Sequence, residues 1–270
     1  MIKQTLKWSA LALALSLPVM AQAHKLWLVP SATNVSGADP WVTEDAAVSN
    51  DLFYPAHMPV ALDRVVITAP DGQAVKAENA STGQYRSVFD VHLTQQGTYK
   101  IAVVNGGLFA NYEVNGEKKR WRGDAANLAK DVPAGAKNLE VSESINRVET
   151  FVTNGKPSDV ALKPTGKGLE LVPVTQFTDL AAGEPATFQL LLDGKPAADV
   201  KIAAIAGETR YRNAQEELDV TTGKDGKFSL NWPHAGMYWI NATAQDDKTS
   251  VKAAKQRRLS YSATLEVLPQ

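Results

Sequence analysis

Short runs in which apolar and polar residues alternate recur along most of the chain. Alternation of this kind is typical of β-strands, because successive side chains point to opposite faces of a sheet. We expect strands over residues 26–29, 60–68, 85–93, 98–104, 148–153, 169–176 and 187–192. The only segment with a helical character is 124–130, and it is too short to shape the fold. The pattern therefore predicts an all-β protein.

Pairs of Asn-Gly or Asp-Gly separate many of these runs. These residues tolerate the positive φ of tight hairpin turns, and the pairs lie at 71–72, 105–106, 115–116, 154–155, 193–194 and 225–226. Many short strands joined by such turns indicate β-sandwiches, and 270 residues suit two of them better than one. Gly and Pro interrupt the strand pattern between 155 and 168, so we predict sandwiches over 24–168 and 169–270. The layout of the second resembles immunoglobulin-like or prealbumin-like modules.

The first 23 residues have the pattern of a secretory signal peptide. Lys3 and Lys7 form a positive start, 8–20 is mostly apolar, and 21–23 reads Ala-Gln-Ala, a small-residue cleavage site. We therefore expect cleavage after Ala23, so that 1–23 is removed. No later apolar run approaches the ~18 residues of a membrane span. The expected product is an exported, soluble protein.

Composition removes several classes of function. The chain has 28 Lys+Arg and 29 Asp+Glu, which gives a formal net charge of −1. Electrostatic binding to nucleic acid is therefore not expected. It has no cysteine, which excludes disulfides, thiolate metal sites and cysteine nucleophiles. The nucleotide-binding and hydrolase motifs are absent as well. A basic run at 118–122 is best interpreted as charge on an exposed hairpin, where it discourages sheet-to-sheet aggregation.

Cleavage after Ala23 would make His24 the first residue of the protein. One residue would then carry both an α-amine and an imidazole, and these two nitrogens can bind one metal ion. A further imidazole would complete a three-nitrogen site suited to Cu(II) or Ni(II). The remaining histidines are His57, His92 and His234.

His57 is the preferred partner, because it lies in 53–59, a segment whose two prolines should hold its backbone in place. His92 is the next candidate; alternation places it on the same face as Asp90, pointing outward. His234 ranks last, because it belongs to the second predicted sandwich. Further donors are a sulfur at Met58 and the carboxylates of Glu44, Asp45 and Asp51.

The segment 23–30, Ala-His-Lys-Leu-Trp-Leu-Val-Pro, resembles the A-H-x-x-W-[LI]-x-P opening of the DUF4198 (NikM-like) family. Weaker landmarks of that family match at 183–184, 193–196, 225–226 and 236–239. The resemblance implies a periplasmic accessory protein of nickel or cobalt uptake, and it carries over only His24 as a site residue. A chain-terminal histidine paired with another is also similar to the copper brace of CopC-like proteins and lytic polysaccharide monooxygenases. Copper is therefore the competing ion.

The leading hypothesis is a periplasmic protein that binds one nickel, cobalt or copper ion through His24 with His57 or His92, and assists its uptake or delivery. An envelope metal transporter is a candidate partner. The alternative is a metal-independent envelope module that binds a transporter, another protein or a glycan. A copper oxidative enzyme ranks lowest, so we expect a binding protein and not an enzyme.

Overall fold

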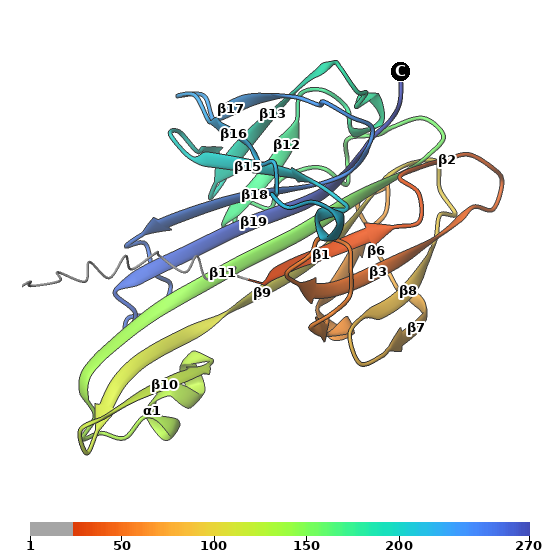
Figure 1. The fold of residues 1–270 in the computed structure, drawn as a ribbon. Helices are drawn as coiled ribbons and strands as arrows, with labels where there is room; N and C mark the ends of the chain where they lie inside the picture. The colour runs from red at the N-terminus through yellow and green to blue at the C-terminus, as the bar shows by residue number, and fades with distance from the viewer. Residues whose placement is uncertain (1–23) are drawn as a thin grey trace, which may run out of the picture.

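The computed structural model describes residues 24–270, and the predicted signal peptide, 1–23, lies outside them. Almost all the regular secondary structure of the described chain is β-strand, which confirms the predicted all-β fold class (Figure 1). The strands of the first half are β1 (Lys25–Pro30), β2 (Asn34–Val35), β3 (Trp41–Ser49), β4 (Met58–Pro59), β5 (Val65–Thr68), β6 (Ala74–Val75), β7 (Glu78–Thr82), β8 (Ser87–His92), β9 (Gly97–Val114), β10 (Glu117–Gly123) and β11 (Lys137–Asn154).

The second half holds β12 (Leu169–Pro173), β13 (Pro185–Leu192), β14 (Lys195–Pro196), β15 (Lys201–Ala206), β16 (Leu218–Thr221), β17 (Lys227–Asn231), β18 (Gly236–Asp246) and β19 (Gln256–Val267). The single α-helix of the described residues, α1, spans Ala125–Asp131, close to the predicted helical segment. Short 3-10 turns cover Leu62–Arg64, Phe177–Asp179 and Thr209–Tyr211.

A central ten-stranded sheet runs through both halves of the chain, in the order β16-β15-β18-β19-β11-β9-β5-β6 with β10 on β9 and β2 on β11. The halves meet where β11 pairs in parallel with β19, from Ser142 opposite Gln256 to Thr150 opposite Thr264. A five-stranded sheet of β1, β3, β4, β7 and β8 and a four-stranded sheet of β12, β13, β14 and β17 complete the fold. The two sandwiches thus share their middle sheet.

The smaller sheets pack on opposite faces of the central sheet, as the alternation along β11 shows. Val148 and Val152 point into the core made with the five-stranded sheet. Ile145 and Phe151, at odd positions, belong to the core made with the four-stranded sheet, where Leu259 of β19 joins them. Because neighbouring side chains of a strand face opposite ways, one strand serves both cores.

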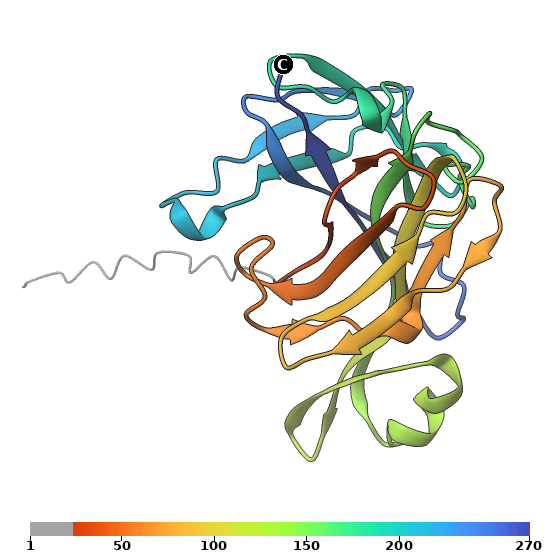
Figure 2. The same cartoon turned by 90° about the vertical axis from the view of Figure 1, so that its right-hand side faces the viewer.

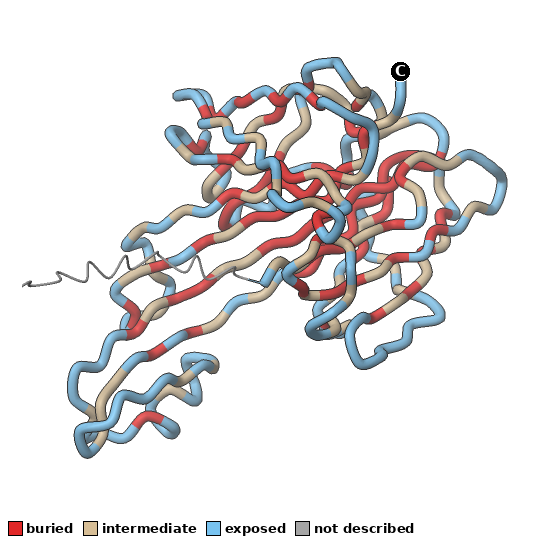
Figure 3. Tube along the Cα trace, in the orientation of Figure 1, coloured by how far each residue is buried: buried red, intermediate tan, exposed pale blue. Residues whose placement is uncertain are grey.

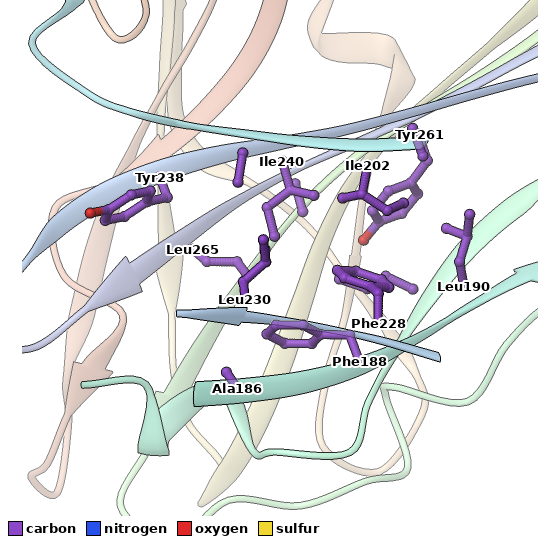
Figure 4. Packing of buried hydrophobic residues seen from close by; sticks show 14 of the residues in the cluster. Ala186, Phe188, Leu190, Ile202, Phe228, Leu230, Tyr238, Ile240, Tyr261 and Leu265 are labelled. Atoms are coloured by element: carbon purple, nitrogen blue, oxygen red, sulfur yellow. The ribbon is translucent and has the colours of Figure 1, made fainter. Parts of the chain in front are cut away.

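The core under the four-stranded sheet is rich in aromatic side chains (Figure 4). Phe188 of β13 lies opposite Phe228 of β17, with ring centroids 5.6 Å apart. Leu230, Ile240 and Tyr261 close over them, each almost fully buried. Full burial of one such side chain stabilises the fold by about 1.5–3 kcal/mol. This core therefore anchors the second sandwich to the central sheet.

A buried polar cluster ties β11 to both β12 and β19. The Arg147 guanidinium donates to Glu149 at 3.2 Å and lies 3.6 Å from the Glu170 carboxylate. The Tyr261 hydroxyl donates to Glu149 at 2.9 Å. Burial, and secondly the charge of Glu149, raises the pKa of Tyr261 well above its ordinary value, so this phenol stays a donor. The paired charges therefore link the two sandwiches where β11 lies beside β12 and β19.

The distal parts of β9 and β11, with β10 and α1, form an arm that projects from the sandwiches (Figure 2). Its tip is the predicted hairpin, now confirmed, with Asn115 and Gly116 at φ 52° and 81°. Leu108, Ala110 and Val141 give the arm a small apolar cluster of its own. Figure 3 shows that most of the arm is nevertheless exposed. The basic run 118–122 lies on β10, whose only strand partner in the described chain is β9.

Candidate metal site

His24 and His57 meet at one end of β3. His24 immediately precedes β1, which pairs with β3 through Lys25 opposite Ser49. His57 immediately precedes β4, which pairs with the other edge of β3 through Met58 opposite Val48. The two imidazole rings stack, with centroids 3.8 Å apart and planes 14° from parallel. The structure therefore brings His24 together with its preferred partner, His57.

The stacked arrangement is not itself a coordination geometry. The nitrogen lone pair of an imidazole lies in the plane of its ring, so two nearly parallel rings direct their lone pairs along parallel planes. A shared metal ion needs lone pairs that converge on one point, at about 2.0–2.1 Å from each nitrogen for zinc-like ions. His24 and His57 are both exposed, so little packing opposes the side-chain rotation that would bring a nitrogen of each ring onto one ion.

Among the described residues, no further His, Asp or Glu side chain joins this pair. Within residues 24–270, no three side chains of the types His, Cys, Asp or Glu are grouped closely enough to hold a metal. Asp45 is paired with Arg86 at 3.1 Å. Glu44 lies in the core, fully buried, with neither carboxylate oxygen hydrogen-bonded in the described chain. Burial, and secondly the charge of Asp45, raises the pKa of Glu44 well above its ordinary value.

His92 lies at the other end of β3, opposite Trp41. Its ring stacks on the Trp41 indole, with centroids 4.0 Å apart and planes 8° from parallel. Its Nε2 shares a hydrogen bond with the Asp39 carboxylate. Asp90, the expected neighbour, instead accepts from Thr43 and Asn79, which lower the pKa of its carboxyl group. Since β3 has nine residues at about 3.3 Å each, roughly 26 Å separates its two ends.

His234 is exposed in the turn between β17 and β18, in the second sandwich. Its backbone carbonyl accepts a hydrogen bond from the Tyr238 hydroxyl at 3.0 Å. Its ring stacks with no other histidine of the described chain. The structure thus brings His57 to His24 and leaves His92 and His234 elsewhere.

A cleft of about 1170 Å³ adjoins the histidine pair, with His24 and Met58 in its wall. It lies between β1, the edge of the five-stranded sheet, and the part of the central sheet that this smaller sheet leaves uncovered. The Trp239 indole of β18 donates to the backbone carbonyl of Leu26 at 3.1 Å and so holds β1 against this face. Burial lowers the pKa of Lys25, while Glu217 and Asp51 act in the opposite direction.

The floor of the cleft consists largely of neutral polar side chains. One row crosses four neighbouring strands in register, and its members are Asn105 of β9, Asn146 of β11, Ser260 of β19 and Thr243 of β18. The Ser260 hydroxyl donates to Asn146 Oδ1 at 2.8 Å. Reasoning from the sequence missed these residues. The signal in the sequence is the strict alternation over 258–267, where a polar residue occupies every even position.

Comparison with known proteins identifies one protein family. The family model described as "Domain of unknown function (DUF4198)" matches residues 21–246. No curated protein matches the chain. The solved structures with a similar fold include the D0-D1 domain of intimin, at 13% identity and a TM-score of 0.23, covering 89% of this chain and 97% of that one.

They also include the FN1-FN3 domains of chicken CNTN1, at 8% identity and a TM-score of 0.22, covering 90% of this chain and 98% of that one. At these identities and TM-scores the similarity supports no conclusion about function. In the described part of the chain, no helix is long and apolar enough to cross a membrane.

Proposed function

This chain belongs to the DUF4198 family, and we propose that it is a periplasmic protein that binds one transition-metal ion, nickel, cobalt or copper, for uptake or delivery. The ligands are the imidazoles of His24 and His57, together with the α-amine that cleavage after Ala23 would place on His24. The observation that carries the proposal is the contact between these two rings. An envelope metal transporter is the partner we propose for delivery.

The chemistry of the donors supports the proposal. A terminal histidine supplies two nitrogens at the entropic cost of ordering one residue, and the second ring already lies 3.8 Å away. A site built from nitrogen donors binds divalent ions in the order Co(II), Ni(II), Cu(II), from weakest to strongest. The partial donor set leaves coordination positions open for exchange, which suits a protein that takes up and releases its ion.

The test is a calorimetric titration of the mature protein with Cu(II), Ni(II) and Co(II), after intact mass has established its first residue. We expect one ion per chain. His24→Ala should weaken binding by more than about 100-fold, because even an outer-shell partner of a metal ligand is worth about 10- to 100-fold. A variant with Ala inserted before His24 keeps the imidazole but displaces the amine, and it should lose affinity as well.

The matched control is His234→Ala, which removes an exposed histidine from the second sandwich. It should bind each ion as the unaltered protein does. Equal affinity of the insertion variant and the unaltered protein would refute the role of the chain terminus. We also propose a binding role and no catalysis, so copper-loaded protein given ascorbate should not generate peroxide.

A metal-independent binding module is the second candidate function. The observation that favours it is the cleft, whose volume of about 1170 Å³ far exceeds that of a metal ion and is slightly larger than is usual for small-molecule sites. A ligand of this cleft that binds equally well to metal-free protein, to His24→Ala and to His57→Ala would support this candidate over the first.

A further inference from the structure

Three cationic side chains surround the cleft, and none of them forms an ion pair within residues 24–270. Arg64 Nη1 donates to the neutral oxygen of Asn105 at 2.7 Å. The Arg122 guanidinium lies over the Phe109 ring, 5.2 Å from its centroid. Lys25 Nζ lies 5.9 Å from the centroid of the Trp239 ring. Neutral and aromatic partners orient these groups without neutralising them.

Two acids also line the cleft, Asp124 and Glu217. Asp124 is already engaged, because it caps α1 by accepting from the backbone N–H of Asn127 at 2.9 Å. Burial, and secondly the charge of Asp219, raises the pKa of Glu217. Three cations against two acids leave the cleft with an excess of positive charge, which favours a ligand that carries carboxylates.

The polar floor adds hydrogen bonds of fixed direction. Arg64 orients Asn105, and Ser260 and Ser144 orient Asn146, so both amides are held before a ligand arrives. Amides and hydroxyls recognise the hydroxyl and carboxylate oxygens of a small organic molecule. Preorganised groups of this kind bind more tightly, because less side-chain entropy is lost on binding.

The cleft and the histidine pair share a wall at His24. Two imidazoles and an amine fill at most three positions of an ion such as Ni(II), and the described chain supplies no further cluster of donors. The open positions then face a cleft equipped for carboxylates.

We infer that the cleft receives the organic part of a metal chelate, a small anion with two or more carboxylates, which completes the coordination of the ion held by His24 and His57. This inference rests on the proposed function. Arg64 and Arg122 bind the carboxylates that do not coordinate the metal, and the floor of amides and hydroxyls binds the remaining oxygens.

The experiment uses citrate as the probe and equilibrium dialysis of the mature protein, with protein-bound citrate and protein-bound metal measured separately. The samples contain Ni(II) alone, citrate alone, and the two together; a parallel series uses Cu(II). We expect citrate to be retained only when metal is present, at one citrate per metal ion. Ethylenediamine, a chelator without carboxylates, should give no such retention.

The double variant Arg64→Gln, Arg122→Gln should retain citrate about 10- to 100-fold more weakly, since each arginine provides a charge-assisted hydrogen bond. Its affinity for Ni(II) alone should be unchanged. Arg120→Gln is the matched control, because it removes the same charge from β10 at a residue outside the cleft. It should behave as the unaltered protein.

The outcomes separate the two proposals. If Ni(II) binds alone but citrate strips it from the protein, the inference is wrong and the proposed function stands. If citrate binds equally well without metal, the cleft is a metal-independent carboxylate site and the chelate inference is wrong. If neither metal nor citrate binds, the proposed function fails and the inference fails with it.

Discussion

The two ends of β3 each present a histidine stacked on another ring, yet the two rings differ in what holds them. At one end His24 and His57 stack on each other, and both are exposed. At the other end His92 lies between the Trp41 indole and the Asp39 carboxylate, and its side chain is only 25% exposed. Stacking alone therefore does not distinguish a metal ligand from a packed histidine.

Only Nε2 of His92 forms a hydrogen bond in the described chain, with the Asp39 carboxylate. A carboxylate that accepts a hydrogen bond from an imidazole also orients the ring, and the indole restricts its rotation. To bind an ion, His92 would have to keep that bond on one nitrogen and coordinate through the other. It would also do so roughly 26 Å from His24, so it cannot share the ion of the first site. The same residue type thus serves packing at one end and remains available at the other.

The largest expected effect is the difference in metal affinity between alanine substitutions of the histidines at the two ends of β3. His57→Ala should weaken Cu(II) and Ni(II) binding by more than about 100-fold, because it removes a direct ligand. His92→Ala should leave both affinities unchanged. Calorimetric titration of the two variants side by side measures the difference. Equal losses in both would mean that His92 takes part in the site or that β3 transmits the damage along its length.

A second test concerns Glu44, which lies between the two ends on the buried face of β3. Its pKa is raised in the folded protein, so the unfolded chain releases this proton first as the pH rises. The free energy of unfolding should therefore fall with rising pH, beginning above the ordinary glutamate value of 4.5 and ending at the raised pKa of the folded state. The slope attributable to one such group is about 1.4 kcal/mol per pH unit.

Glu44→Gln keeps the shape of the side chain and cannot ionise, so it should lack this slope. Urea denaturation of both proteins across the acid-to-neutral range gives the comparison. Parallel curves for the two proteins would show that Glu44 is charged in the folded state or finds a partner there. Metal affinity at the His24 end should be the same in both proteins at a fixed pH, because Glu44 donates to no ligand of that site.

The sequence predicts the core of this molecule better than its periphery. The expected strand 98–104 is the buried beginning of β9, and 148–153 is the buried end of β11; each of these strands is in fact 18 residues long. The residues of both strands farthest from these segments form the arm, where side chains are little buried and backbone hydrogen bonds hold the strands together. Alternation reports burial on one face, so it is silent where both faces of a strand are exposed.

The candidate site shows the same division. The pairing of His24 with His57 was predicted because a terminal histidine would offer two nitrogens to one ion and the two prolines near His57 should hold its backbone in place. The hydrogen bond from His92 to Asp39 was not predicted, because the two lie 53 positions apart and meet only through strand pairing. The polar row of Asn105, Asn146 and Ser260 depends on the register of three strands, which no local pattern specifies.

A third test measures what the packed end contributes to stability. His92→Ala removes a stacked aromatic contact, worth about 0.5–1.5 kcal/mol, and a hydrogen bond to a carboxylate that is mostly exposed and therefore adds little. We expect a loss of about 1 kcal/mol in the free energy of unfolding. His57→Ala, at an exposed position, should change it by less than about 0.5 kcal/mol. Chemical denaturation of both variants without metal measures these two losses. His92→Ala should have the larger effect on stability, whereas His57→Ala should have the larger effect on metal affinity.

The smallest expected effect concerns Cu(I) at the end of β3 where His24 and His57 lie. Met58 is 48% exposed and lines the cleft with His24, so its thioether can approach an ion held there. A thioether is a soft ligand that favours Cu(I) over Ni(II). Met58→Leu preserves the apolar volume and removes only the sulfur, so it should weaken Cu(I) binding by about threefold to tenfold and leave Ni(II) binding unchanged.

Competition with a chromophoric Cu(I) chelator, under anaerobic conditions, measures the Cu(I) affinity, and calorimetry measures the Ni(II) affinity. An equal loss for both ions would assign Met58 to packing around His57, whereas no loss for either would show that the nitrogens of His24 and His57 bind copper without it.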